Sequence, residues 1–254
     1  MRELEGSMMK NNRAENINNR NLGIMGRFLM MVLAAMIITT VGAPVAQAQL
    51  EDVKKPEPTV PQAFTLQGEF VRMAYNNEGF VTLGYRVAND SVGDEWMLLE
   101  MGVTLQNKIK AQDLTREDLT LVTPDGTHIP LAAQEEFNKA NLRALDRRAT
   151  MVRDSIDYFP AGVIRARTMN FFADPSGKAR TLAYDQVSLH YQHAVMGRIY
   201  FRVPGGIKVG QHWVYVQFAD SVVQVPFRVF TKAEEKEFRK MWKTLKKEHE
   251  EGVE

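Results

Sequence analysis

Histidines are the side chains whose spacing comes closest to a chemical site. His190 and His193 lie three residues apart, so on a helix they would share a face and could bind one metal ion. Residues 187–193 instead favour a strand, on which side chains three apart point to opposite sides. Zinc also needs further ligands in a tetrahedral array. We therefore predict no metal or cofactor, and keep as the alternative a secreted hydrolase or metal-dependent enzyme that uses His190, His193 or His212.

Residues for nucleophilic or acid–base catalysis are not grouped by any motif. Serines such as Ser188 and Ser221 are present, but no Gly-x-Ser-x-Gly turn exposes a nucleophile. The chain has no cysteine, which excludes disulfides, thiolate zinc sites and thiol catalysis. The many acidic residues lie in polar segments, where no catalytic pair can be singled out. We therefore predict a protein that is not an enzyme and has no catalytic residues.

The charge and the composition of the chain limit the kinds of partner that it could bind. The 254 residues include 32 Lys and Arg against 31 Asp and Glu, and 44% are hydrophobic. Phosphate binding requires clustered excess cations, so this balance excludes a strongly basic nucleic-acid binder. The apolar fraction and the length are sufficient for a substantial core. We therefore expect a folded protein whose partner is a protein or another envelope component, and not a nucleic acid.

A local excess of arginine could contact such a partner. Arg143, Arg147 and Arg148 belong to it, and guanidinium groups pair well with carboxylates and phosphates. The alternative is a solvated helix face whose charge is balanced by neighbouring aspartates. We predict these three residues as part of a partner surface.

Aromatic residues give two further predictions of a partner surface. Trp213 and Tyr215 alternate on one strand face and could bind sugars or a partner protein, unless a helix buries them. Phe238 and Trp242 form an apolar stripe on the last helix, which serves either as core or as an interaction handle.

The elements that position these residues are mainly strands. Apolar and polar residues alternate in 81–87 and 97–105, which is the period of a half-buried strand. Turn signals punctuate the runs, as in Thr-Pro-Asp-Gly at 123–126 and Ala-Asp-Ser at 219–221. Short strands without alternating helices favour an antiparallel sandwich over a parallel sheet. The sequence therefore predicts a mainly β fold, an antiparallel β-sandwich, over residues 62–231.

Two long helices interrupt this pattern. Apolar residues at helical spacing predict an inserted helix near 133–156. Residues 232–254 read as a C-terminal amphipathic helix, which Thr231 and Glu234 begin with a capping-box pattern. A similar pattern at Thr115 and Asp118 predicts one short helical turn.

The N-terminal segment, residues 1–48, has the parts of an export signal after a disordered, Asn-rich extension. Arg27 precedes the apolar run 28–41, and Ala-Gln-Ala at 46–48 suits a signal peptidase. An uncleaved anchor is the alternative, and translation starts at either Met1 or Met25. Residues 49–61 contain three prolines and read as a linker.

Four segments carry a resemblance. They are Val-Thr-Leu-Gly-Tyr-Arg-Val-Ala-Asn-Asp at 81–90, Leu-Thr-Leu-Val-Thr-Pro-Asp-Gly-Thr-His at 119–128, Ile-Tyr-Phe-Arg-Val-Pro-Gly at 199–205 and Gln-Val-Pro-Phe-Arg at 224–228. Their order resembles the immunoglobulin-like sandwiches of bacterial exported proteins of unknown function. The resemblance covers about half of the chain beyond the signal and implies a fold without a particular activity. The inserted and C-terminal helices depart from it.

Taken together, these patterns predict an exported module, periplasmic or extracellular, that binds or supports another component. It would meet a membrane only through its signal segment, if that segment stays attached.

Overall fold

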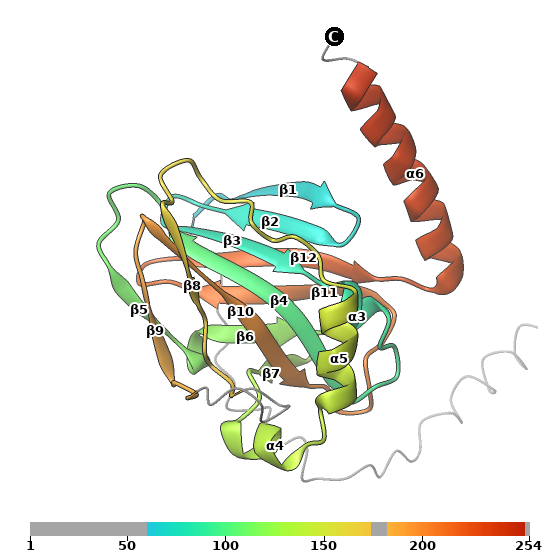
Figure 1. The fold of residues 1–254 in the computed structure, drawn as a ribbon, viewed down its shortest axis with the longest axis horizontal. Coiled ribbons are helices and arrows are strands. Elements are labelled where there is room, and N and C mark those ends of the chain that lie inside the picture. Colours follow the sequence, from blue (N-terminus) through green and yellow to red (C-terminus); the bar gives the residue numbers. More distant parts are fainter. Residues whose placement is uncertain (1–59, 174–181, 252–254) are drawn as a thin grey trace, which may run out of the picture. The chain divides into compact units, whose positions relative to one another are not determined.

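The computed structural model describes residues 60–173 and 182–251 (Figure 1), so the predicted signal and residues 49–59 of the predicted linker lie outside them. The described chain is mainly β, with several antiparallel sheets and a C-terminal helix. The strands are β1 (Ala63–Gly68), β2 (Val71–Tyr75), β3 (Gly79–Gly84), β4 (Trp96–Leu105), β5 (Gln112–Thr115), β6 (Leu119–Val122), β7 (His128–Pro130), β8 (Arg165–Thr168), β9 (Gln186–Leu189), β10 (His193–Arg202), β11 (Gly210–Gln217) and β12 (Val222–Val229). The helices are α3 (Arg86–Asn89), the 3-10 turn η1 (Arg116–Asp118), α4 (Gln134–Lys139), α5 (Arg143–Met151) and α6 (Lys232–Glu251). No helix in the described ranges is long and apolar enough to cross a membrane.

Two large sheets and one small sheet organise the strands. The six-stranded sheet has the order β1-β2-β3-β4-β10-β8, and the four-stranded sheet has the order β12-β11-β6-β7. The small sheet pairs β5 with β9. All pairs are antiparallel except β10 with β8, which is parallel. This parallel pair departs from the predicted antiparallel fold. After β8 the chain turns back through β9 and turns again into β10, so β10 and β8 run in the same direction.

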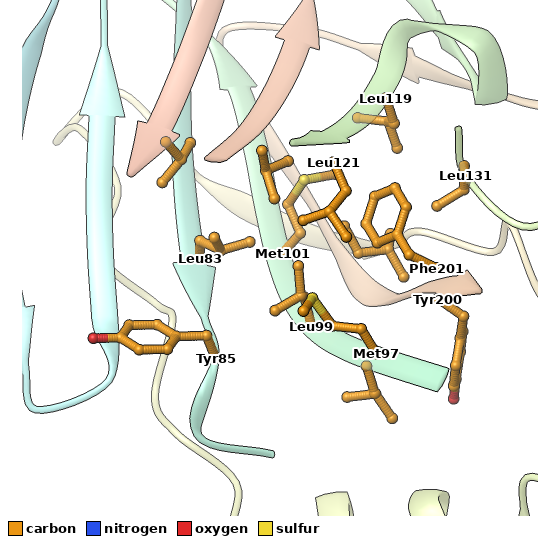
Figure 2. Close-up of a cluster of buried hydrophobic side chains, with 14 of the residues drawn as sticks. Leu83, Tyr85, Met97, Leu99, Met101, Leu119, Leu121, Leu131, Tyr200 and Phe201 are labelled. Carbon is orange, nitrogen blue, oxygen red and sulfur yellow. The ribbon is translucent and has the colours of Figure 1, made fainter. Parts of the chain in front are cut away.

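The two large sheets share one hydrophobic core. Figure 2 shows side chains from β3, β4, β6 and β10 converging between the sheets. Met101 of β4, Leu121 of β6 and Phe201 of β10 are each fully buried there. The alternation predicted for 97–105 therefore places one side of β4 in this core, as expected for a strand with period 2.

The other side of β4 is also covered, which the alternation did not predict. Thr82 of β3 donates a hydrogen bond to the carbonyl oxygen of Ile156 over 3.0 Å. A Cβ built on Gly102 would lie 2.6 Å from the ring of Phe159. The segment after α5 therefore lies directly on the outer face of the six-stranded sheet, and it explains why β3 is buried along its whole length.

The helical insertion predicted as one element near 133–156 is two short helices. Ala140 has an extended ψ of 142°, which ends α4 before α5 begins. A continuous helix would place Phe137 and Leu142 about 140° apart around its axis. Both side chains are buried, and the break allows this. Phe137 packs against Phe172, with 4.8 Å between the ring centroids.

The strand predicted over 81–87 ends early. β3 stops at Gly84, and the Asn89 N–H donates to the carbonyl oxygen of Tyr85 in the single turn α3. This turn brings the Asn89 amide to the start of α6, where its oxygen accepts from the Phe230 N–H over 2.7 Å. Contacts with a distant helix therefore override the local alternation.

Three local predictions are confirmed. The turn at 123–126 connects β6 to β7, and Gly126 has a φ of +81°, which a residue with a Cβ rarely adopts. Asp118 accepts from the backbone N–H of Thr115 in the predicted short turn. Glu234 accepts from the Thr231 N–H over 2.8 Å at the start of α6.

Candidate functional site

The outer side of the four-stranded sheet carries the two aromatic residues predicted on β11. Trp213, Tyr215 and Gln217 are half-buried and alternate with fully buried core residues. Trp213 meets Phe64 of β1 edge-on, with 6.4 Å between the ring centroids. Tyr215 meets His128 of β7 at 6.0 Å. Their ring contacts are therefore with strand residues and not with a covering helix.

Cross-strand pairing extends this surface over three strands. Residues directly opposite each other in an antiparallel pair lie on the same face. Trp213 is paired with residues of β12 and β6 on either side, and so is Tyr215. We call this surface the aromatic face, and its residues are Thr120, Val122, Trp213, Tyr215, Gln224 and Pro226. Thr120 and Val122 are buried, so the other four residues form its accessible part.

The aromatic face has the chemistry of an uncharged binding surface. Its six side chains are aromatic, aliphatic, amide or hydroxyl groups without formal charge. Partial burial raises the pKa of Tyr215, so its hydroxyl stays protonated and can donate a hydrogen bond. Flat rings beside hydrogen-bonding groups suit the apolar side of a sugar ring or an uncharged part of a protein surface. His128, which is paired with Val122 and meets the Tyr215 ring, places one imidazole at the edge of this face.

The three arginines predicted as part of a partner surface do not have the same role. Arg148 donates to the Ser91 hydroxyl over 2.6 Å and lies 3.5 Å from Asp94, so it ties α5 to the segment after α3. Arg143 and Arg147 are exposed on α5 and form no hydrogen bond or ion pair with another described residue. The guanidinium groups of these two residues are therefore accessible, whereas that of Arg148 is structural.

The residues of the apolar stripe predicted on α6 also lie in two different environments. Phe238 stacks on Phe230, with 4.9 Å between the ring centroids, and packs the start of the helix against the sheets. Trp242 lies one turn further and is half-buried. Met241 and Leu245 are 51% and 46% exposed. No hydrogen bond, ion pair or ring contact between described residues joins the α5, β11 and α6 groups, so they do not form one continuous site.

A cleft of about 540 Å³ lies on the outer face of the six-stranded sheet, beside β8, β10 and the segment after α5. Glu100 of β4 lines it, although only 6% of this residue is exposed. Arg198 lies directly opposite Glu100 in the ladder between β4 and β10. Nitrogen atoms of Arg198 and Arg153 each approach the Glu100 carboxylate to 3.7 Å. Arg198 also forms an ion pair with Asp146 of α5.

Charges in this cleft compensate one another. Burial raises the pKa of Glu100, while Arg198 and Arg153 act in the opposite direction. The cleft is lined by three acidic and three basic residues, namely Glu100, Asp146, Asp157, Arg153, Arg167 and Arg198. This balance indicates that the arginines neutralise a buried carboxylate and do not collect an anionic ligand.

Our sequence analysis did not identify Glu100 or Arg198. Glu100 was nevertheless detectable, because it is the single charged residue in the apolar run 97–103. A carboxylate in such a run needs a partner when the strand is buried. The partner, Arg198, follows 98 positions later and has no local signal.

The histidine pair adopts a geometry opposite to the prediction. His190 and His193 flank a tight turn between β9 and β10, in which the His193 N–H donates to the His190 carbonyl oxygen over 3.1 Å. Their ring centroids are 5.4 Å apart, so the side chains lie together rather than on opposite sides. Desolvation and the charges of Arg167, His190 and Arg165 lower the pKa of His193. The same arginines oppose the approach of a metal cation.

His212 belongs to a different sheet and lies in the core. It is fully buried and stacks on Phe227, with 5.2 Å between the ring centroids. Its Nδ1 atom lies 3.1 Å from the carbonyl oxygen of Gly210, and burial lowers its pKa, which favours the neutral ring. Over residues 60–173 and 182–251, no three His, Cys, Asp or Glu side chains are grouped so that they could hold a metal ion. The three histidines therefore do not form one site.

Comparisons of this chain with protein-family models, curated proteins and solved structures found no match.

Proposed function

We propose that this protein is an exported, non-catalytic module that binds another component of the cell envelope or extracellular space through its aromatic face. The observation that carries this proposal is the pair Trp213 and Tyr215, half-buried on the outer side of a sheet whose other side is core. Large rings held rigidly on a strand lose little conformational entropy on binding and are frequent anchors of interfaces.

Export rests on the pattern of the first 48 residues. A cation, an apolar run and a small-residue end would carry the chain out of the cytoplasm into the periplasm or beyond. The lack of cysteine means that the fold relies on burial rather than on disulfides in that compartment.

The fold in this proposal is an immunoglobulin-like sandwich. Its support is the shared core of two sheets that are antiparallel apart from the pair β10 and β8, and the resemblance carried by segments 119–128 and 224–228. Such sandwiches present faces and edges to partners without needing a reaction centre. A protein or polysaccharide component of the envelope fits the uncharged chemistry of the aromatic face.

The test is sedimentation of the protein, as its native cell processes it, with isolated envelope fractions. Three forms are compared: the wild type, Trp213→Ala/Tyr215→Ala, and the control Tyr158→Ala/Tyr184→Ala, whose tyrosines are 37% and 51% exposed elsewhere. We expect the wild type and the control to sediment with one fraction and the β11 variant to stay in solution. Equal behaviour of the three forms would refute the proposal. Stoichiometric zinc, lost in His190→Ala, would instead favour the metal-dependent enzyme.

A further inference from the structure

The strand β8 is an open edge of the six-stranded sheet. Among the described strands it pairs with β10 alone, and all of its residues are exposed. The Met169 N–H donates to the carbonyl oxygen of Met196 over 2.7 Å, so the odd-numbered residues of β8 turn their backbone groups to β10. The backbone groups of Ala166 and Thr168 therefore point away from the sheet, where another strand could bind them.

The other edges of the two large sheets carry features that hinder such pairing. β1 has an irregular register near Gly68, and β7 ends at Pro130. β12 contains Pro226, which has no N–H, and its Gln224 N–H already donates to the Gln62 side chain over 2.9 Å. Bulges, prolines and covered N–H groups protect an edge strand from pairing. Among the described edges of these sheets, β8 has none of these features.

The side chains of β8 form a cationic side and a side of small residues. Arg165 lies beside His193 in the ladder with β10, and Arg167 is two residues further along β8, so these three side chains project on one side of the sheet. Ala166 and Thr168 project on the other side. Neither arginine forms a hydrogen bond or an ion pair with a described residue. Both guanidinium groups are therefore available to a ligand.

The segments around these arginines contain no compensating carboxylate. Residues 158–173, which include β8, and residues 186–202, which include β9 and β10, have no Asp or Glu. Of the three carboxylates that line the neighbouring cleft, two are paired with Arg198, and the third, Asp157, forms no ion pair with β8. The edge therefore carries positive charge that a partner could neutralise.

We propose that the free edge of β8 binds an extended acidic segment of a partner protein, which adds to the six-stranded sheet as a further strand. Hydrogen bonds to the backbone of Ala166 and Thr168 would supply affinity, as in other cases of strand addition. Because side chains alternate along a strand, acidic residues at every second position of that segment would lie beside Arg165 and Arg167. This contact is independent of the aromatic face, which lies on the other large sheet.

A second copy of this chain fits the edge less well. Two antiparallel β8 strands would bring Arg165 and Arg167 of both copies onto one side of the sheet. Like charges opposite one another destabilise a strand pair. The arginines therefore disfavour self-pairing and favour a strand of opposite charge.

The test uses the protein as its native cell processes it and a fluorescent peptide that repeats Glu-Val four times. Fluorescence anisotropy gives the dissociation constant at low and at physiological salt. A peptide with Gln in place of Glu tests the charge. Two further peptides carry N-methyl groups on either all Glu or all Val residues, so each blocks the N–H groups along one edge of the peptide strand.

Variants of β8 test the same contacts on the protein. Arg165→Gln/Arg167→Gln removes the charge, and its control is Lys108→Gln/Lys110→Gln, which removes the same charge from another exposed segment. Ala166→Pro removes an N–H of the free edge, whereas the control Ala166→Val keeps it. Thermal unfolding checks that each variant is folded. The N-methylated peptides test the edge on the wild type if the proline variant does not fold.

We expect the wild type and both controls to bind the acidic peptide, and salt to weaken this binding. The arginine variant, Ala166→Pro and the Gln peptide should each reduce affinity about 10-fold. One N-methylated peptide should lose binding while the other retains it, because a strand pairs through one edge.

Three results would overturn the proposal: no saturable binding of the acidic peptide by the wild type, equal affinity of the arginine variant, or equal affinity of the two N-methylated peptides. A concentration-dependent dimer that Ala166→Pro abolishes, without peptide binding, would also overturn it and assign the edge to a second copy of the chain.

Discussion

The hydroxyl of Ser221 donates a hydrogen bond to the carboxylate of Glu78 over 2.6 Å, across 143 positions of sequence. Glu78 lies in the turn between β2 and β3, and Ser221 lies in the turn between β11 and β12. Asn76 of the first turn donates to the Ser221 oxygen over 2.9 Å. The two turns belong to the two large sheets, so this buried contact joins the sheets at one end of the core.

Removing the Ser221 hydroxyl should destabilise the fold. Ser221→Ala leaves the Asn76 amide and one Glu78 oxygen without this partner, which costs about 1–3 kcal/mol in a buried site. Urea unfolding measures the loss against Ser155→Ala, which changes an exposed serine. Equal free energies of unfolding for the two variants would show that the contact does not join the sheets.

Glu100 should make stability fall as the pH rises. Burial raises its pKa above the ordinary value of 4.5, so the folded state binds this proton more tightly than the unfolded chain does. Its contribution is fully present below pH 4.5 and is lost as the pH rises through the raised pKa. The wild type should therefore lose stability relative to Glu100→Gln between acidic and neutral pH.

Unfolding free energies of both forms across this range provide the check. Their difference removes the effect of other carboxyl groups, and the exposed Glu95→Gln serves as the control. A difference that is constant with pH, or that changes in the opposite direction, would contradict the assignment of Glu100.

The contribution of Glu234 to stability should depend on pH in the opposite direction to that of Glu100. The Thr231 backbone N–H and the Arg228 guanidinium lower the pKa of this carboxyl to about 2. Its contribution to the start of α6 is therefore present above the ordinary value of 4.5 and is lost as the pH falls towards about 2. Circular dichroism should show that Glu234→Gln removes this acid-dependent loss of helix, whereas Glu237→Gln retains it. Identical acid titrations of the two variants would disprove the cap.

A methyl group at Gly197 should disrupt the parallel edge of the six-stranded sheet. A Cβ there would lie 2.4 Å from the carbonyl oxygen of Met169, which belongs to the backbone and cannot simply rotate away. Gly197→Ala should therefore cost about 1–3 kcal/mol, the usual range for overpacking. Gly162→Ala is the matched control, because a Cβ there meets no atom within 4 Å. Chemical denaturation that ranks the two variants equally would be the contrary result.

Local signals in the sequence were sufficient for many strands and turns. The run predicted over 97–105 corresponds to β4 (Trp96–Leu105), and the turn at 219–221 separates β11 from β12. Alternation along β11 also separated Trp213 and Tyr215 from the core residues. These features depend on the period of side chains along a strand and on turn residues, which nearby sequence carries.

The structural features that could not be predicted from the sequence depend on contacts between segments that are far apart in the chain. The predicted helix near 133–156 is broken at the extended Ala140, and Phe137 and Leu142 on either side of the break are both buried against distant parts of the chain. His190 and His193 lie together because a turn connects β9 to β10. Arg198 reaches Glu100 only after β4 and β10 pair. Alternation placed Trp213 and Tyr215 on one strand face. It could not identify Thr120, Val122, Gln224 and Pro226, because these residues join the aromatic face only when β6 and β12 pair with β11.

Affinity for the captured envelope component tests the proposed function most directly. The dissociation constant is measured for the wild type, for Trp213→Ala/Tyr215→Ala and for the control Tyr158→Ala/Tyr184→Ala. If the aromatic face is the binding surface, the first variant should bind about 30-fold or more weakly, as expected when anchor residues are removed, and the control should bind like the wild type. Equal affinity of the two double variants would contradict the account.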